Sequence, residues 1–291
     1  MGEGQRIITC FYDCDQTLIP EFMQNPLLRH LGVDPAEFWA DDKKLMKEAS
    51  EVDVTINSEN SYMINLILHI KKGKLPQLSN ADLQRYGKEL ITPFPGLPEF
   101  FLRTKEEVRT RYRDQGITLE HYIISTGLRK MIQGSSLNAP GALDQIFASE
   151  FVEVDGVISL PARNVGFIEK TRYIYEVSKG TNVDQSIDVN KRIPYGKRRV
   201  PFENMIYVGD GFTDVPCMTM LTKLGGQSIG VYDPNNPKSL EEATELFQDR
   251  RVYRIAKADY HQGGEASEAI EDSLHCVAAR IINKDHKPKG P

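Results

Sequence analysis

The sequence lacks the features that mark several broad classes of protein. Its four cysteines are scattered and form no CxxC pair, which argues against a tetracysteine zinc site or a secreted disulfide framework. The apolar run YMINLILHI (62–70) is far shorter than the roughly 20 residues that span a bilayer. The opening MGEGQRIITC has no apolar stretch behind a basic start, and a net charge of −5 does not favour nucleic acid. We therefore expect a reduced, cytoplasmic protein with no membrane segment and no nucleic-acid partner.

Three short apolar runs are typical of buried strands in a parallel sheet. They are RIITCFY (6–12), EHYIIST (120–126) and NMIYVGD (204–210), and each is followed by a polar or glycine turn and a helical pattern. GQSIGVYD (226–233) and RVYRIA (251–256) are further candidates. Strands separated by helices predict a Rossmann-like α/β core with helical crossovers.

The stretch between the first two strands does not show this alternation of strand and helix patterns. Residues 20–118 contain amphipathic helical patterns broken by proline and glycine. We expect a small helical domain here, inserted into a discontinuous α/β core formed by residues 1–19 and 119–291. Residues 180–201 have little helix or strand pattern and predict a surface loop, whose basic residues are explained most simply as solvated.

Two carboxylates follow the first strand one residue apart, Asp13 and Asp15 in YDCDQTL. Residues i and i+2 of a strand project to the same side, and like charges about 5 Å apart repel by about 3 kcal/mol at an effective dielectric of 20. Such a pair requires a cation, a shared proton or a chemical task. Ligands of open parallel sheets bind beyond the carboxyl ends of the strands, which is where these two residues lie.

Two more carboxylates follow the third strand. The segment GDGFTD carries Asp210 and Asp214, which would stand on one face of a helical continuation, one turn apart. Together with Asp13 and Asp15 they predict four carboxylates at one edge of the sheet. That arrangement fits a hard, oxygen-binding divalent cation, and Mg²⁺ is the usual one when a phosphate shares the site.

The sequence also offers groups that could hold a phosphate. Lys170 lies at the start of the helical pattern GFIEKTRYIYEV and would act as a point charge toward phosphate oxygens. After the second strand come Ser125, Thr126 and Gly127, whose hydroxyl and turn amides could donate the remaining hydrogen bonds.

These motifs, taken in order, resemble the haloacid dehalogenase superfamily. They are Asp-x-Asp-x-Thr, Ser-Thr-Gly, a lysine at a helix start and Gly-Asp-Gly-x-x-Asp. The helical insertion after the first motif and the stretch IFASEFVEVDGVI before the lysine resemble the phosphoserine-phosphatase-like branch. Each motif alone could be an ordinary turn, loop or surface lysine, so their order carries the resemblance. The resemblance covers residues 1–19 and about 119–260. It does not extend to individual residues of the inserted helical domain, which forms a cap in that branch.

The resemblance implies a Mg²⁺-dependent phosphatase that hydrolyses a small phosphorylated metabolite through an aspartyl-phosphate. Asp13 would be the nucleophile, and Asp15 the general acid and base, with its backbone carbonyl facing the metal. The phosphoryl group would be bound by Lys170 and Ser125, within the turn that continues through Thr126 and Gly127. The metal would be held by Asp13, Asp15 and Asp210, with Asp214 supporting it directly or through water.

Two departures from the branch bear on the substrate. Thr213, after the bulky Phe212, stands where the branch often has asparagine. Phe22 stands where amino-acid-selective members carry a cap glutamate, and Glu21 is one place out of register. Both departures argue against phosphoserine as the substrate. A phosphotransferase and a non-catalytic phospholigand-binding protein remain alternatives, whereas Asp15 argues against a dehalogenase, which normally lacks it. The oligomeric state stays open.

Overall fold

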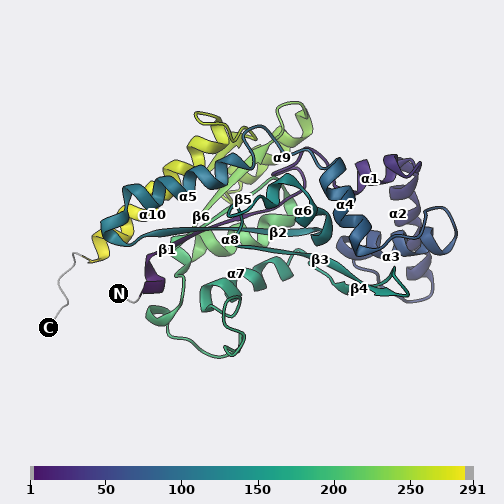
Figure 1. Ribbon diagram of the computed structural model, residues 1–291, viewed down its shortest axis with the longest axis horizontal. Coiled ribbons are helices and arrows are strands. Elements are labelled where there is room, and N and C mark those ends of the chain that lie inside the picture. Colours follow the sequence, from purple (N-terminus) through teal and green to yellow (C-terminus); the bar gives the residue numbers. More distant parts are fainter. Residues whose placement is uncertain (1–2, 286–291) are drawn as a thin grey trace.

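The central feature of the computed structural model, which describes residues 3–285 and side chains from residue 5 to residue 284, is a seven-stranded sheet (Figure 1). Its strand order is β4-β3-β2-β1-β5-β6-β7, and all neighbours are parallel except β3 and β4. The strands are β1 (Ile7–Tyr12), β2 (Thr118–Leu128), β3 (Gln145–Val154), β4 (Val157–Arg163), β5 (Met205–Gly209), β6 (Gln227–Tyr232) and β7 (Arg254–Lys257).

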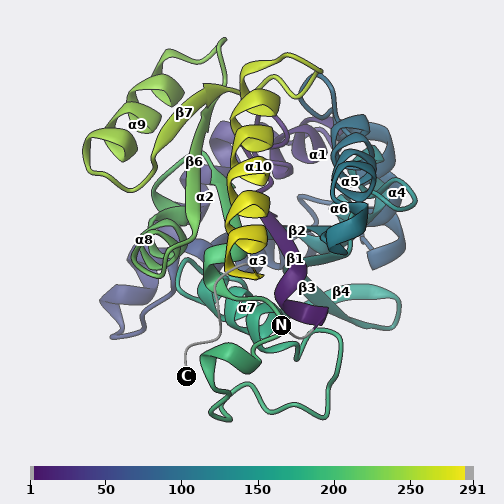
Figure 2. The same cartoon turned by 90° about the vertical axis from the view of Figure 1, so that its left-hand side faces the viewer.

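Helices cover both faces of this sheet, which explains why its strands are apolar on both sides. On β1, Cys10 and Tyr12 join the apolar cluster under α5 (Glu99–Arg111) and α10 (Glu265–Asp285). Phe11 points the other way, into the cluster with α7 (Glu169–Lys179) and α8 (Val215–Lys223). Figure 1 shows the two helix layers on opposite sides of the strands, and Figure 2 shows α5 beside α10. The remaining helices of this part are α6 (Arg129–Gly134) and α9 (Pro237–Gln248).

Four helices gather at one end of the molecule, next to the β3–β4 hairpin (Figure 1). They are α1 (Gln24–His30), α2 (Pro35–Glu51), α3 (Ser58–Lys71) and α4 (Asn80–Leu90). The first turn of α4 is fixed by a capping box, in which Ser79 and Asp82 each bind the other's backbone N–H. The next helix, α5, packs instead on β2 and α10. The division into residues 20–118 and residues 1–19 with 119–291 stays a prediction, and residues 1–2 and 286–291 lie outside the described part of the chain.

The predicted α/β core with a parallel sheet is confirmed, with one correction to the second strand. We expected Ser125, Thr126 and Gly127 to follow that strand, but they lie within β2. The pairing of β2 with β3 is irregular between Ile124 and Leu128, as at a β-bulge, so the strand resumes after the interruption. Residues 180–201 contain one short 3₁₀ turn, Tyr195–Lys197, and no α-helix or strand.

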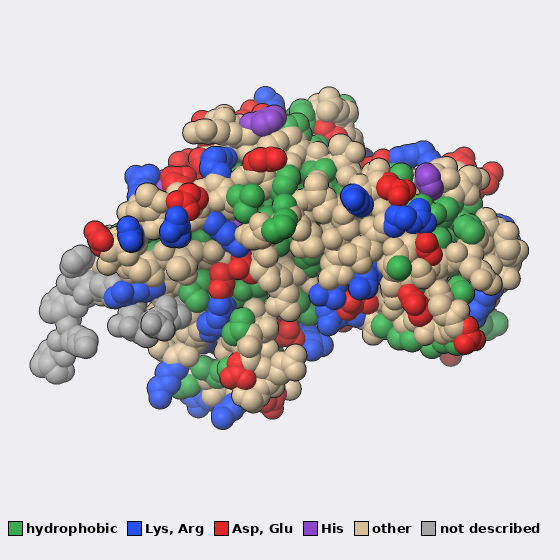
Figure 3. Space-filling model, viewed as in Figure 1, with side chains coloured by type: hydrophobic (Ala, Val, Ile, Leu, Met, Phe, Trp, Pro, Cys, Tyr) green, Lys and Arg blue, Asp and Glu red, His purple; other side chains and the backbone are tan. Residues whose placement is uncertain are grey.

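The outer surface and the helices add two further observations. Lys and Arg side chains are interspersed with Asp and Glu on the face shown in Figure 3, so this face carries no extended surface of one sign. Within residues 3–285, no helix combines the length and the apolar character needed to cross a bilayer.

Candidate active site

The sheet topology brings the two aspartate motifs together. Strands β1 and β5 are parallel neighbours, so the residues after both strands meet at one edge. The Asp13 backbone N–H donates to the Val208 carbonyl oxygen at 3.0 Å, which carries the pairing one residue beyond β1. The side chains of Asp13, Asp15, Asp210 and Asp214 are all buried at this edge. Of the four carboxylates expected together, Asp13, Asp210 and Asp214 come together, and Asp15 lies near Asp13 but outside their cluster.

Lys170 lies between two of these carboxylates. Its Nζ is 3.0 Å from Asp13 Oδ2 and 2.8 Å from Asp214 Oδ1, and it reaches Thr213 Oγ1 at 3.3 Å. The lysine comes from the first turn of α7 and is completely buried. Burial by itself lowers the pKa of Lys170, but the two carboxylates outweigh it and hold that pKa above its ordinary value. The site therefore contains a permanent positive charge next to Asp13.

Three of the carboxylates form a compact cluster. Asp13, Asp210 and Asp214 each offer one oxygen, and these oxygens lie within 4.8 Å of one another. Asp210 Oδ1 accepts from Thr17 Oγ1 at 2.9 Å, and Asp214 Oδ1 accepts from Tyr207 Oη at 2.7 Å. Burial, and then the Asp214 and Asp13 charges, raise the pKa of Asp210 well above its ordinary value.

This cluster fits a hard divalent cation. The other oxygen of Asp214, Oδ2, is buried and has no hydrogen-bond partner in the described part of the chain. Such an oxygen is costly in a folded protein unless a ligand satisfies it. Carboxylate oxygens are also the donors that Mg²⁺ prefers.

Asp15 stands apart from the cluster and is held differently. Its Oδ1 accepts from the backbone N–H of Met23 at 3.0 Å, just before α1. Burial, followed by the charge on Asp13, raises the pKa of Asp15 to about 8. Burial, and then Asp214, also raise the pKa of Asp13, to about 7, and the Lys170 charge opposes the shift at both aspartates. Both aspartates therefore have a raised pKa, and they differ in their contacts, since only Asp13 forms an ion pair with the lysine.

The Ser-Thr-Gly segment of β2 lies beside Asp15. A Cβ built on Gly127 would lie 3.2 Å from Asp15 Oδ2, which shows how closely the backbone approaches the carboxyl group. Ser125 is buried, and its Oγ accepts from the Gly127 N–H at 3.0 Å. The Thr126 carbonyl oxygen accepts from Tyr62 Oη, on α3, at 2.8 Å. The three predicted phosphate-binding residues are thus next to Asp15 and in contact with the helices at the end of the molecule.

Several side chains at the site were not expected from the sequence. Met23, Gln24 and Tyr62 reach it from the helical end of the molecule, and Gln24 Oε1 is buried with no partner among the described residues. Tyr207 is an interior residue of β5, and nothing in its surroundings in the sequence distinguishes it from a core residue. Of these additional residues, Thr17 could have been found from the sequence, because it belongs to the Asp-x-Asp-x-Thr motif.

Comparison with known proteins agrees with this geometry at the level of the fold. No model of a known protein family matches the chain. An "Uncharacterized protein" of Borreliella burgdorferi is 29% identical over 282 residues, which covers 90% of this chain and 95% of that protein. A HAD family hydrolase from Salmonella enterica serovar Typhi is similar in structure, with a TM-score of 0.52, 18% identity, and coverage of 86% of this chain and 67% of that one.

A probable phosphoserine phosphatase from Vibrio cholerae is also similar, with a TM-score of 0.52, 14% identity, and coverage of 95% of this chain and 67% of that one. At these identities the likeness concerns the fold, and it confirms the expected architecture. The chain has the haloacid dehalogenase-like fold, in the form found in phosphoserine-phosphatase-like structures.

Proposed function

We propose that the protein is a Mg²⁺-dependent phosphatase that hydrolyses a small-molecule phosphomonoester. The observation that supports this most directly is the position of Lys170, buried between Asp13 and Asp214. A lysine placed there leaves Asp13 able to act as an anion while offsetting the charge that develops on a phosphoryl group. A structural ion pair alone would not need the additional buried carboxylates of Asp15 and Asp210 beside it.

In the first step, a carboxylate oxygen of Asp13 attacks phosphorus. The new Asp13 O–P bond forms as the bond from phosphorus to the leaving oxygen breaks, and Asp15 gives its proton to that oxygen. The raised pKa of Asp15, about 8, is consistent with a carboxyl group that carries a proton at neutral pH. Lys170 and Ser125 hold the phosphoryl oxygens during this transfer.

In the second step, the aspartyl-phosphate is hydrolysed. Asp15, now ionised, takes a proton from a water molecule whose oxygen attacks phosphorus. The Asp13 O–P bond breaks, the Asp13 carboxylate is restored and inorganic phosphate leaves. Because Asp13 contacts Lys170 and Asp15 does not, one aspartate serves as nucleophile and the other as acid and base.

The cation would be held by Asp13, Asp210 and Asp214, whose oxygens already lie close together. We also propose that the Asp15 backbone carbonyl faces it. When bound, Mg²⁺ neutralises the carboxylates and stabilises negative charge on the phosphoryl group.

The helices α1 to α4 act as a cap over this site. Met23 and Tyr62 already connect them to Asp15 and to the Thr126 carbonyl oxygen. Closure of such a cap excludes bulk water while the covalent intermediate forms. Phe22 is 46% exposed, and no carboxylate occupies its position, so we expect substrates other than phosphoserine to be preferred.

The test is phosphate release from a panel of phosphomonoesters, measured with Mg²⁺ and with EDTA. The panel contains phosphoserine, phosphoethanolamine, phosphocholine, sugar phosphates, nucleotides and an aryl phosphate. We expect metal-dependent release that falls by at least about a thousandfold in Asp13→Asn. Asp272→Asn is the matched control, because Asp272 is an exposed aspartate on α10. Release that persists in Asp13→Asn or in EDTA would contradict the proposal.

Metal binding is tested separately by calorimetry with MgCl₂, comparing the wild type with Asp210→Asn. We expect the variant to bind Mg²⁺ at least about tenfold more weakly while keeping its fold. Metal binding without release from any ester would point instead to a phosphotransferase or to a binding protein.

A further inference from the structure

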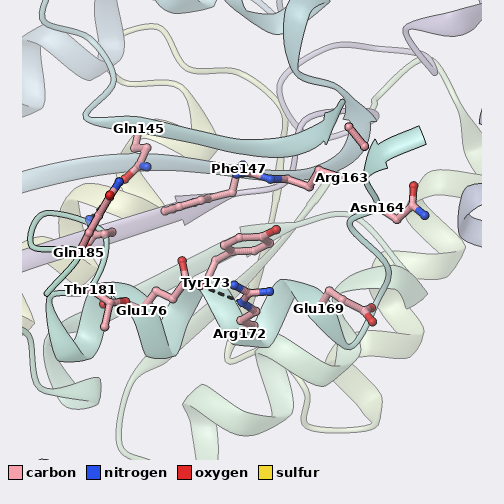
Figure 4. Close-up of a pocket in the computed structure, with 12 residues that line it drawn as sticks. Gln145, Phe147, Arg163, Asn164, Glu169, Arg172, Tyr173, Glu176, Thr181 and Gln185 are labelled. Atoms are coloured by element: carbon pink, nitrogen blue, oxygen red, sulfur yellow. Dashed lines mark hydrogen bonds and ion pairs between the residues drawn. The ribbon is translucent and has the colours of Figure 1, made fainter. Parts of the chain in front are cut away.

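A cavity of about 430 Å³ lies on the α7 side of the sheet (Figure 4), and none of the clustered carboxylates lines it. Four residues of α7 line it, at positions i, i+3, i+4 and i+7, so they form one face of the helix. They are Glu169, Arg172, Tyr173 and Glu176. The neighbouring face of the same helix carries Lys170 into the site described above. The cavity is therefore distinct from the phosphoryl site and shares a helix with it.

The two ends of the cavity differ in chemistry. At one end lie uncharged amides, with Gln145 and Gln185 side by side in Figure 4. Arg172 of α7 lies near the middle of the cavity, and at the other end lie charged groups, including Arg163 from the end of β4 and Glu169. The ring of Tyr173 lies between them, stacked on Phe147 with a centroid distance of 4.6 Å.

Several of the lining groups have unused hydrogen-bonding capacity. Asn182 Oδ1 is buried and has no partner among the described residues. The side chains of Asn164 and Gln185 also form no hydrogen bond with any residue that the structure describes. Both arginines of the cavity already pair with a carboxylate through Nε, Arg163 with Glu150 at 3.5 Å and Arg172 with Glu176 at 2.8 Å. Their Nη groups have no hydrogen-bond partner among the described residues and can engage another anion.

We propose that this cavity binds a nucleoside monophosphate. Amide side chains present a donor and an acceptor together, which matches the edge of a nucleobase. The aromatic rings give the flat base an apolar surface, and the two guanidinium groups suit the phosphate. Glu169, which has no ion-pair partner within the described residues, can accept from the ribose hydroxyls. The volume is in the range of sites that enclose small metabolites. The proposal does not depend on the catalytic function proposed above.

The test is calorimetric titration of the full-length protein in EDTA, which suppresses metal-dependent binding at the carboxylate cluster. The probes are AMP, GMP, CMP and UMP, with adenosine and inorganic phosphate to separate the base from the anion. We expect at least one mononucleotide to bind with a dissociation constant below about 1 mM, and adenosine and phosphate to bind at least about tenfold more weakly.

Variants then locate the binding. Arg163→Ala and Gln185→Ala should each weaken it by about tenfold, because each removes one hydrogen-bonding group at opposite ends of the cavity. Arg109→Ala on α5 and Gln248→Ala at the end of α9 are the matched controls, since both residues are exposed and lie outside the cavity. Both should bind like the wild type.

Three results would overturn the proposal. One is the absence of mononucleotide binding by folded wild-type protein. Another is binding that survives in both cavity variants but is lost in Asp210→Asn, which would assign the nucleotide to the carboxylate cluster. The third is equal binding of inorganic phosphate and every mononucleotide, because the base would then contribute nothing.

Discussion

The Met23 thioether lies directly against Gly127. Met23 Sδ accepts a hydrogen bond from the Leu128 N–H at 3.1 Å, and a Cβ added to Gly127 would lie 2.4 Å from Met23 Cε. The backbone N–H of the same methionine donates to Asp15 Oδ1 at 3.0 Å. A single residue at the start of the helical segment therefore contacts both the proposed general acid and the proposed phosphate-binding turn.

Gly127→Ala should lower the rate of phosphate release without unfolding the protein. The added methyl group displaces the Met23 thioether and crowds Asp15, and a shift of about 1 Å in such a site can cost about a hundredfold in rate. Because the methionine side chain is flexible, we expect a small change in Tm. The measurement is kcat/KM with the preferred ester, together with thermal unfolding.

The matched test is the double variant Met23→Ala/Gly127→Ala. Removing the thioether makes room for the methyl group, so the double variant should be more active than Gly127→Ala alone. If the two substitutions were simply additive, the contact between Met23 and Gly127 would have no role in the loss.

Lys170 and Asp214 should be strongly coupled in stability. Lys170→Met leaves Asp13 and Asp214 buried without their cation, which should lower the free energy of unfolding by about 3–5 kcal/mol. Asp214→Asn in the same background removes one of the stranded charges and should restore part of the loss. The measurement is urea unfolding in EDTA for the wild type, both single variants and the double variant.

An exposed ion pair provides the comparison for this cycle. Arg109 and Glu106 on α5 lie 2.8 Å apart, and their side chains are 74% and 59% exposed. A cycle on this pair should give a coupling below about 1 kcal/mol. A coupling between Lys170 and Asp214 that is equally small would contradict the view that the lysine is the counter-ion of the buried carboxylates.

The sequence allowed the charged part of this site to be predicted because its geometry follows from general rules of topology. Asp13 and Asp210 each come directly after a strand, and parallel neighbours end at the same edge of the sheet. To predict the position of Lys170, it was enough to assume that the helix before the third strand begins near that edge. Few other arrangements of these residues are compatible with a parallel sheet.

The apolar and backbone contacts of the site could not be predicted in the same way. Met23 and Tyr62 reach it only because of how α1 and α3 pack, and helical periodicity shows that a face is buried without showing against what. The bulge that places Ser125 inside β2 depends on the pairing with β3, which the sequence of β2 does not show. The partners of His121 could not be predicted either: the structure places it in the core, between Tyr12 and Thr104.

His121 should make the protein less stable as the pH falls. Burial, with a smaller effect of the Lys105 charge, lowers the pKa of His121 well below its ordinary value. Below about pH 6.5 the unfolded chain therefore binds one more proton at this residue than the folded chain. Its contribution to the free energy of unfolding is complete above that pH and falls by up to about 1.4 kcal/mol per pH unit below it.

The measurement is urea unfolding at pH values between 7.5 and 5.5 for the wild type and His121→Gln. The variant should be less stable at pH 7.5, because the hydrogen bonds to Tyr12 and Thr104 are disturbed, yet its stability should change less with pH. The exposed His30, replaced by Gln, is the control and should keep the wild-type slope. Equal slopes for the wild type and His121→Gln would show that the pKa of His121 is the same in the folded and the unfolded protein, which would contradict the prediction.

Gly87→Ala should destabilise the protein even though alanine is the better helix former. Helices α4 and α6 cross so closely that a Cβ on Gly87 would lie 2.0 Å from the Met131 carbonyl oxygen, and a Cβ on Gly134 would lie 1.8 Å from the Gln84 carbonyl oxygen. Both obstacles are backbone atoms, so the helices must move apart. The alanine gains about 1 kcal/mol in helix propensity, but separating two packed helices costs about 1–3 kcal/mol or more.

Thermal and urea unfolding would measure this effect, with Gly196→Ala as the control. A Cβ on Gly196 meets nothing within 4 Å, and its φ is not positive, so the control should be neutral or slightly stabilising. Gly134→Ala acts on the same crossing, and once one substitution has separated the helices the second should cost less than it does alone. Full stability of Gly87→Ala would mean that α4 does not pack on α6 in solution. The contacts of α4 with the β3–β4 hairpin would then have to hold this helix beside the site. One of these contacts is the hydrogen bond that Asn80 Nδ2 donates to the Phe151 carbonyl oxygen at 3.1 Å.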